Sequence, residues 1–176
     1  MHYLQTAFAQ LHFVWKLYNY ALEGNINREE LDREITFKSE DGRQIFVLPG
    51  RIFESHDDFI LAFENNLSIT FGAATITLNR SRYEAGHDLP NPIESENEQC
   101  IAFVYQLRCA FAHDISEPNW KIKGRFKRKY RFGGMEFDLT NLDGERFAYC
   151  HIVGPEYLGF VKDFAVEHLL HSGKVR

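Results

Sequence analysis

The residues with the clearest chemical potential lie in the stretch Tyr105–Asp114, at the end of a predicted helix. Arg108 comes four residues after Val104, which places its guanidinium near the apolar side of that helix, where an unpaired charge is costly. His113 follows five residues later, and both the helix C-terminus and the adjacent Asp114 favour its protonated form. An arginine that binds phosphate and a histidine that titrates near neutral pH are the groups that a metal-free ribonuclease needs.

The same residues also allow a purely structural role. Arg108 could form a buried ion pair with a carboxylate elsewhere, and His113 could cap its own helix. Cys109 and His113 are spaced for a hydrogen bond on one helical face. However, a helix C-terminus raises the pKa of a thiol, so we expect Cys109 to be a small buried residue and not a nucleophile. We see no metal-ligand spacing and no phosphate-binding glycine loop, so no metal or cofactor is expected.

The elements that must position this stretch are mainly helical. Ser55 with Asp58, and Ser95 with Glu98, have the spacing of N-terminal capping residues. Apolar residues recur at helical intervals after each of them, and Gly154-Pro155 introduces a last amphipathic run. We predict four helices, over His2–Glu23, from Ser55 to about Tyr83, from Glu96 to Ala112 or His113, and after Pro155 with Leu158, Val161, Ala165 and Leu169 inward.

Two regions have β-type patterns instead. Asp41-Gly42 predicts a tight turn in a hairpin over Ile35–Leu48. From Trp120 onward, short strands are predicted over Trp120–Phe132, Glu136–Thr140 and Arg146–Ile152. The predicted fold class is therefore mainly α, an up-and-down helical bundle with small β insertions, as one domain over residues 1–176 whose β-rich insertion covers about 119–152.

The composition limits the class of protein. The 176 residues are 44% hydrophobic and 15% aromatic, which excludes a disordered chain and supports a core without disulfides. Cys100, Cys109 and Cys150 lack disulfide spacing, which suits a reducing cytoplasm. We find neither a signal peptide nor a run of ~18 apolar residues. We therefore expect a cytoplasmic protein without a membrane partner.

The net charge of −5 is unevenly distributed. The segment Lys121–Arg131 has seven basic residues and no acid, so the other residues have a net charge of −12. Phe126 and Tyr130 alternate with the basic residues, and aromatic faces can stack on bases while cations bind phosphates. The alternative is a two-stranded ribbon with a solvated basic face and with Ile122 and Phe126 inward. The candidate RNA-binding residues are Lys121, Lys123, Arg125, Lys127, Arg128 and Lys129.

Arg108 and His113 at the end of a helix, followed by a short polar turn with Pro118, resemble the R-x4-6-H motif of the HEPN superfamily. The segments Pro118–Ile122 and Asn141–Gly144, with the closing helix, are similar to those of stand-alone bacterial HEPN-like proteins. The resemblance covers about residues 95–171.

This resemblance implies a helical bundle that forms a homodimer, with two motifs facing each other in one cleft. Active members cleave RNA without metal, leave a 2′,3′-cyclic phosphate and act in toxin–antitoxin, defence or RNA-processing systems. Arg108 and His113 would be the catalytic pair, and a cognate antitoxin would be a partner. Cys109 departs from the polar residue that commonly follows the arginine, and a thiol is a weak donor. An inactive HEPN-like module that binds nucleotide, nucleic acid or a partner protein therefore stays open.

Overall fold

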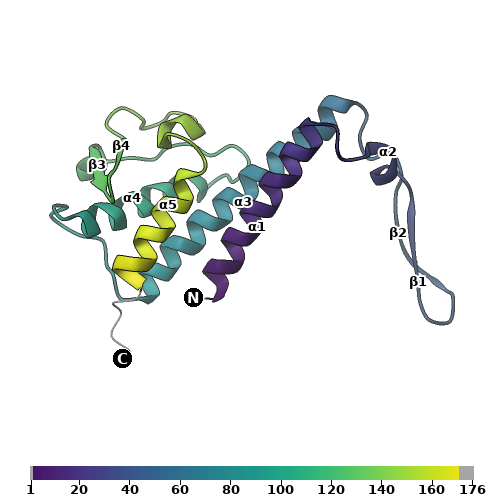
Figure 1. Ribbon diagram of the computed structural model, residues 1–176, viewed down its shortest axis with the longest axis horizontal. Helices are drawn as coiled ribbons and strands as arrows, with labels where there is room; N and C mark the ends of the chain where they lie inside the picture. The colour runs from purple at the N-terminus through teal and green to yellow at the C-terminus, as the bar shows by residue number, and fades with distance from the viewer. Residues whose placement is uncertain (1, 171–176) are drawn as a thin grey trace. The chain divides into compact units, whose positions relative to one another are not determined.

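The computed structural model describes residues 2–170, and the side chains of residues 3–170. These residues form five α-helices and two small antiparallel hairpins, and about 54% of the chain is helical, so the predicted mainly α class is confirmed. The chain divides into two compact units. Unit 1 consists of the residues up to Leu11 and from Ser68 onward, and unit 2 consists of His12–Leu67. Figure 1 labels the elements.

Two long helices begin or end within unit 2. Helix α1 (His2–Leu22) and helix α3 (His56–Glu84) match the predicted helices. The predicted cap of α3 is present, because Ser55 Oγ accepts from Asp58 N at 3.1 Å and an Asp58 carboxylate oxygen accepts from Ser55 N at 3.0 Å. Each bond satisfies a backbone donor that the first helical turn leaves free.

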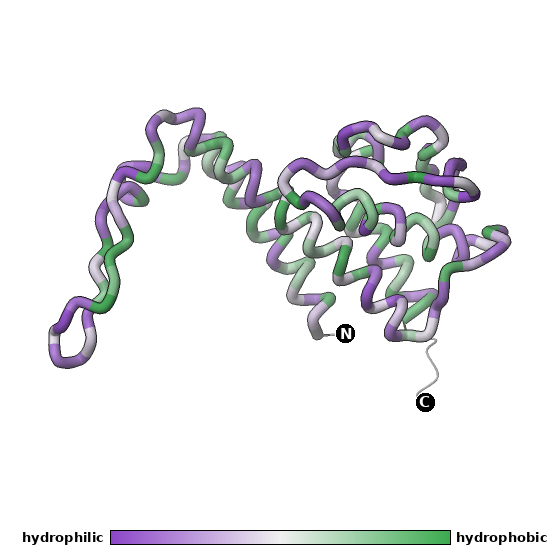
Figure 2. The backbone as a smooth tube through the Cα atoms, turned by 180° about the vertical axis from the view of Figure 1, so that it is seen from behind, coloured by the Kyte–Doolittle hydropathy of each residue, from purple (hydrophilic) through white to green (hydrophobic). Residues whose placement is uncertain are grey.

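A hairpin and a short helix fill the rest of unit 2. Strands β1 (Ile35–Lys38) and β2 (Gln44–Leu48) pair antiparallel around the predicted turn, and the Phe37 and Phe46 rings stack at 5.5 Å. Figure 2 shows hydrophobic residues along this hairpin, and most of them are exposed. Helix α2 (Arg28–Leu31) was not predicted, and Asn27 caps it through Glu29 N.

The core of unit 1 lies between helices. Helix α4 (Glu96–Phe111) packs against helix α5 (Tyr157–Ala165), which continues as the π-helical turn η3 (Val166–Leu170). The part of α3 in this unit buries its apolar face. The residues predicted to face inward on the last helix are all buried, and so are three from the predicted stripe of α3: Leu158, Val161, Ala165 and Leu169, and Phe71, Ala74 and Leu78.

A second hairpin covers α4. Strands β3 (Lys129–Phe132) and β4 (Met135–Asp138) pair antiparallel, and β3 packs on the helix. Phe103 of α4 is fully buried, and its ring stacks on Phe137 at 4.2 Å. Aromatic packing of this kind fixes the position of the basic segment on α4.

Two strand predictions are corrected in this region. The predicted first strand is regular only from Lys129, because a 3₁₀ turn, η1 (Gly124–Phe126), precedes it and Gly124 has a φ of +55°. The predicted strand over 146–152 is wrong. Arg146 forms only an isolated bridge with Asn119, and the chain continues as a second 3₁₀ turn, η2 (Tyr149–Ile152). The ladder ends there because Pro118, the next residue along it, has no N–H to donate.

Helix α3 is the one helix within residues 2–170 whose length and apolar composition would suffice to cross a membrane. Buried helices of protein cores meet the same criteria, and Phe71, Ala74 and Leu78 of α3 are fully buried in unit 1. The absence of a membrane partner stays a prediction.

Candidate functional site

The C-terminal half of α4 holds the predicted catalytic arginine. The helix starts at the predicted capping box, in which Ser95 Oγ accepts from Glu98 N at 3.3 Å and Glu98 accepts from Ser95 N at 2.8 Å. Leu107 and Phe111 are buried, so α4 is fixed against the core close to Arg108. This rigid support gives a functional side chain a defined position.

Arg108 is half-buried and has no acidic partner. None of the residues from 2 to 170 forms an ion pair or a hydrogen bond with its side chain. The structural alternative for Arg108, a buried ion pair, is therefore absent from the described part of the chain. A half-buried guanidinium without a counter-ion is poised to bind an anion, because its charge is only partly solvated.

His113 lies in the bend that follows α4, and its side chain is exposed. The carboxylate of the neighbouring Asp114 accepts hydrogen bonds from within the turn that follows it. One of its carboxylate oxygens accepts from Ser116 N, Ser116 Oγ and Glu117 N at 2.8–3.0 Å. These bonds, above all the one from the Glu117 N–H, lower the pKa of Asp114. In the described structure Asp114 shapes the turn and forms no ion pair with His113.

The loop that carries His113 is anchored to α3. Ser68 Oγ donates to the Ile115 carbonyl at 3.1 Å. Gly72 faces the same loop, and a Cβ at this position would lie 2.7 Å from an Ile115 side-chain atom and 2.8 Å from Phe111. Because glycine leaves this space open, the chain after α4 can approach α3 closely and hold His113 near the helix end.

Tyr105 is a residue of the site that the sequence prediction did not include. It lies one turn before Arg108 and Cys109 on the same helical face. A hydrogen bond with Cys109 raises the pKa of Tyr105, while the positive charges of Arg108 and Arg82 act in the opposite direction. Tyr105 thus interacts with three residues of the site: Cys109, Arg108 and Arg82. The spacing i, i+3, i+4 within α4 was the available signal for the first three.

Arg82 is the second cation beside Tyr105, and it was also not predicted. It is 4% exposed, at the last turn of α3. Its guanidinium donates to Asn79 Oδ1 at 3.0 and 3.2 Å and to the His87 carbonyl, and burial lowers its pKa. These acceptors are neutral, so the positive charge of Arg82 has no salt-bridge partner in the described residues.

Tyr105 also joins α4 to the basic segment. Its ring lies 5.6 Å from the ring of Phe126, centroid to centroid, and the Arg125 guanidinium lies 4.9 Å from the Phe126 centroid. Arg108, Tyr105, Phe126 and Arg125 thus form a surface in which two neighbouring rings lie between two cations, called the cation–aromatic strip below. Such a combination of rings and cations suits a single-stranded nucleic acid, which offers base faces and phosphates.

The remaining candidate RNA-binding residues fall into two groups. Lys127 pairs with Asp143 at 3.0 Å, and Lys129 lies 3.5 Å from Glu136 and from Asp138. Arg128 donates to the Ile93 carbonyl at 2.7 Å. Lys121 and Lys123 are exposed and form no salt bridge within residues 2–170. The basic segment therefore offers Lys121, Lys123 and Arg125 to a partner more readily than its other cations.

The cysteines and other ligand types give no second chemical site here. Cys109 is half-buried, more exposed than expected, whereas Cys100 is fully buried and Cys150 is exposed. No group of three or more His, Cys, Asp or Glu side chains in the described chain could hold a metal ion.

Comparison of the chain with known family models, with curated proteins and with solved structures gives no match.

Proposed function

We propose that this chain is an HEPN-like, RNA-directed protein that acts as a metal-independent endoribonuclease, with Arg108 and His113 of two copies facing one cleft. Its helices would form the HEPN-like bundle, and its role would be that of a toxin or defence protein. The observation that carries the proposal is the half-buried Arg108 guanidinium, which has no acidic partner in the described residues, with the exposed His113 five residues further along.

The chemistry assigned to the pair balances without a metal. A neutral His113 takes the proton of the RNA 2′-OH, and the 2′ oxygen attacks the adjacent phosphorus. Arg108 stabilises the negative charge that develops on the pentavalent phosphate. The P–O bond to the 5′ oxygen then breaks, and that oxygen leaves with a proton from the imidazolium of the second copy. The products are a 2′,3′-cyclic phosphate and a 5′-hydroxyl end.

The charge distribution supports RNA binding to unit 1. Unit 2 contains 6 basic and 11 acidic residues, a net charge of −5 that equals the total for the chain. Unit 1 therefore has 14 basic and 14 acidic residues, and several of its acids are paired near the basic segment. RNA would meet a neutral unit with a local excess of cations on the cation–aromatic strip, while unit 2 would repel it.

The direct test is RNA cleavage in excess EDTA with analysis of the product ends. The wild-type chain should yield cyclic phosphates, and His113→Ala and Arg108→Ala should each lower the rate by about a hundredfold or more. His12→Ala and Arg80→Ala, which remove an exposed histidine and an exposed, paired arginine, serve as matched controls. Undiminished cleavage by folded His113→Ala would refute the assignment.

The second candidate is a non-catalytic HEPN-like module that binds nucleotide, nucleic acid or a partner protein. The observation in its favour is Cys109 itself, a weak donor at the position after Arg108 whose side chain interacts with Tyr105 of the same helix. This alternative predicts that the affinity for RNA decreases as the salt concentration rises, and that no RNA is cleaved even at saturating protein.

A further inference from the structure

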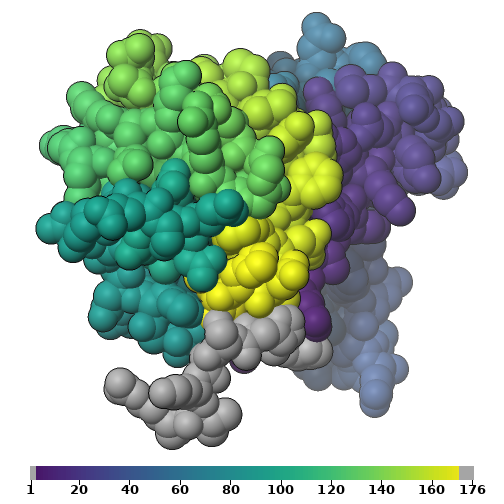
Figure 3. Space-filling view, turned by 60° about the vertical axis from the view of Figure 1, so that its left-hand side comes forward, coloured from purple at the N-terminus to yellow at the C-terminus, as the bar shows by residue number. Residues whose placement is uncertain are grey.

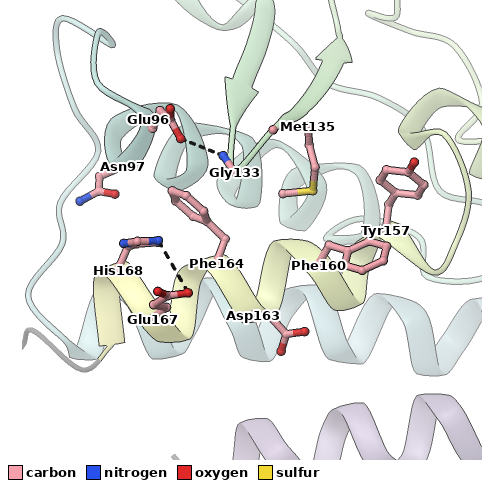
Figure 4. Close-up of a pocket in the computed structure, with 11 residues that line it drawn as sticks. Glu96, Asn97, Gly133, Met135, Tyr157, Phe160, Asp163, Phe164, Glu167 and His168 are labelled. Carbon is pink, nitrogen blue, oxygen red and sulfur yellow. Dashed lines mark hydrogen bonds and ion pairs between the residues drawn. The ribbon is translucent and has the colours of Figure 1, made fainter.

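A pocket lies at the opposite end of α4 from Arg108. It has a volume of about 750 Å³ and lies among the start of α4, the β3–β4 turn and α5 with η3 (Figure 4). Glu96, at the start of α4, lines it, and the twelve residues from Glu96 to Arg108 correspond to about 18 Å of helix. In Figure 3 the α5 surface, in yellow, is bordered by the green β3–β4 segment and by the teal start of α4.

The walls of the pocket consist mainly of aromatic rings and the polarisable thioether of Met135. In Figure 4 the Met135 side chain projects toward α5, where Phe164 and Phe160 lie on either side of it, with Tyr157 beyond. Phe160 is 55% exposed, an unusually large apolar surface for a ring in a concave site. Aromatic faces carry negative quadrupole charge, and a thioether is polarisable, so both favour a large, weakly hydrated cation.

The charged residues around the pocket also favour a cationic ligand. Glu96, Asp163 and Glu167 line it together with His168, and none of its lining residues between 2 and 170 is a lysine or an arginine. Glu96 accepts from Gly133 N at 2.8 Å, which keeps its carboxylate at the rim, and Glu167 is 3.8 Å from His168. Asp163 points away from Met135 in Figure 4 and pairs with Lys162, so Glu96 and Glu167 set the local charge.

Of the cations near this rim, Lys162 neutralises Asp163, and His168 beside Glu167 is charged only when protonated. Lys162 pairs with Asp163 at 2.6 Å, and Arg131 pairs with Glu136 at 2.7 Å. Each cation is therefore balanced by its own partner. An aromatic pocket whose described lining has three acids, one histidine and no lysine or arginine is complementary to an organic cation and repels phosphate or carboxylate ligands.

We propose that this pocket binds an organic cation, an alkylated ammonium group held between Phe160, Phe164 and Met135 and balanced by Glu96 and Glu167. The site is separate from Arg108 and His113, so it stands whether or not the chain cleaves RNA. Free quaternary amines and the trimethyl-lysine side chain of a peptide both present this group.

The chain offers an internal reporter for the test. It contains only two methionines, Met1 and Met135, so a ¹³C-methyl-methionine sample gives one signal from the pocket and one reference signal. Titration of the full chain with choline should shift the Met135 signal saturably and leave Met1 unchanged. The neutral isostere 3,3-dimethylbutan-1-ol, which has the same shape without the charge, should bind about tenfold more weakly.

Variants separate the aromatic and the electrostatic contributions. Phe160→Leu, which keeps an apolar side chain, should weaken choline about fivefold and leave the neutral isostere unaffected. Glu167→Gln should have a similar effect, whereas Glu145→Gln, an exposed acid outside the pocket, should have none. An unshifted Met135 signal, or equal binding of choline and its isostere, would overturn the proposal.

The source of the ammonium group is decided by one comparison. A short peptide with a trimethyl-lysine is titrated under the same conditions as choline. Binding of the peptide about tenfold tighter than choline assigns the site to a modified protein, and equal or weaker binding assigns it to a small free amine. Both outcomes support the ammonium site itself.

Discussion

The rings of Tyr105 and Phe126 lie 5.6 Å apart at an angle of 42°, which joins the helix of the candidate catalytic arginine to the basic segment. The pair is the one observed ring contact between Tyr105 and that segment, and Arg125 extends it on the far side. Arg108 and Arg125 thus belong to one continuous surface, although they lie on different elements. A single RNA strand that runs along the cation–aromatic strip could contact both cations.

The first prediction concerns the role of this ring pair in RNA binding. Tyr105→Leu should weaken binding of single-stranded RNA by about fivefold to a hundredfold, because stacking on an aromatic side chain contributes about 1–3 kcal/mol per base. Tyr105→Phe keeps the ring and removes only the hydrogen bond with Cys109, so its affinity should stay near that of the wild type. Fluorescence anisotropy with a labelled RNA measures both variants. Equally weakened binding in the two variants would argue against stacking.

The second prediction distinguishes cations that bind phosphate from cations already paired within the protein. Lys121→Gln with Lys123→Gln should reduce the slope of log affinity against log salt by about 0.7 for each phosphate that the variant no longer neutralises. Lys127→Gln with Lys129→Gln removes the same net charge, but these lysines are paired with Asp143, Glu136 and Asp138. The slope of log affinity against log salt should therefore change little in this second double variant.

The matched design removes the effect of overall charge, because both double variants remove two positive charges. A difference in slope therefore reports direct binding of RNA phosphates. An equal reduction of the slope in the two variants would show that the basic segment acts only through its long-range field. No change in either variant would mean that RNA binds elsewhere.

Local signals in the sequence were sufficient for the helices. The capping residues Ser55 and Ser95 make the predicted hydrogen bonds, since a cap depends on residues only three positions apart. The inward face of the last helix follows from its 3.6-residue period. The failed strand over 146–152 had the right residue types, but a strand also needs a partner, and Pro118 ends the ladder.

The site was only partly predictable for a related reason. Arg108 and His113 lie close in sequence, so their spacing on one helix end could be worked out. Arg82 and Phe126 reach Tyr105 from other elements, and no local pattern encodes those contacts. The ion pair between Lys127 and Asp143 could not be predicted either, because Asp143 lies in a loop beyond the hairpin.

The third prediction is a loss of stability at alkaline pH through Cys100. Burial raises the pKa of this thiol from 9.0 to about 12. Between these values the unfolded chain releases the thiol proton and the folded chain keeps it, so the free energy of unfolding falls as the pH rises. The slope from this group is at most about 1.4 kcal/mol per pH unit, and its contribution is fully retained below pH 9.

Urea unfolding between about pH 8.5 and 10 measures this effect, since most tyrosines and lysines titrate mainly above that range. Cys100→Ala should flatten the dependence of the unfolding free energy on pH. Cys150→Ala is the matched control, because Cys150 is exposed and its removal should leave the slope unchanged. Identical slopes for all three chains would show that the buried thiol does not control the alkaline transition.

The fourth prediction uses two glycines with opposite surroundings. At Gly72 a Cβ would collide with Ile115 and Phe111, at 2.7 and 2.8 Å, so Gly72→Ala should destabilise the protein by about 1–3 kcal/mol and displace the loop of His113. At Gly159, inside α5, a Cβ would meet nothing within 4 Å. Gly159→Ala should therefore stabilise the protein by about 0.5–1 kcal/mol.

The two variants make the same chemical change on helices of unit 1, so they separate the effect of the clash from helix propensity. Displacement of the loop also has a functional consequence. Gly72→Ala should lower RNA cleavage while RNA binding to the cation–aromatic strip persists, because His113 moves and Tyr105 does not. A folded Gly72→Ala protein with full cleavage would show that the close approach of Ile115 to α3 does not position His113. Gly159→Ala should leave both activities intact, which makes any loss in Gly72→Ala specific to the loop.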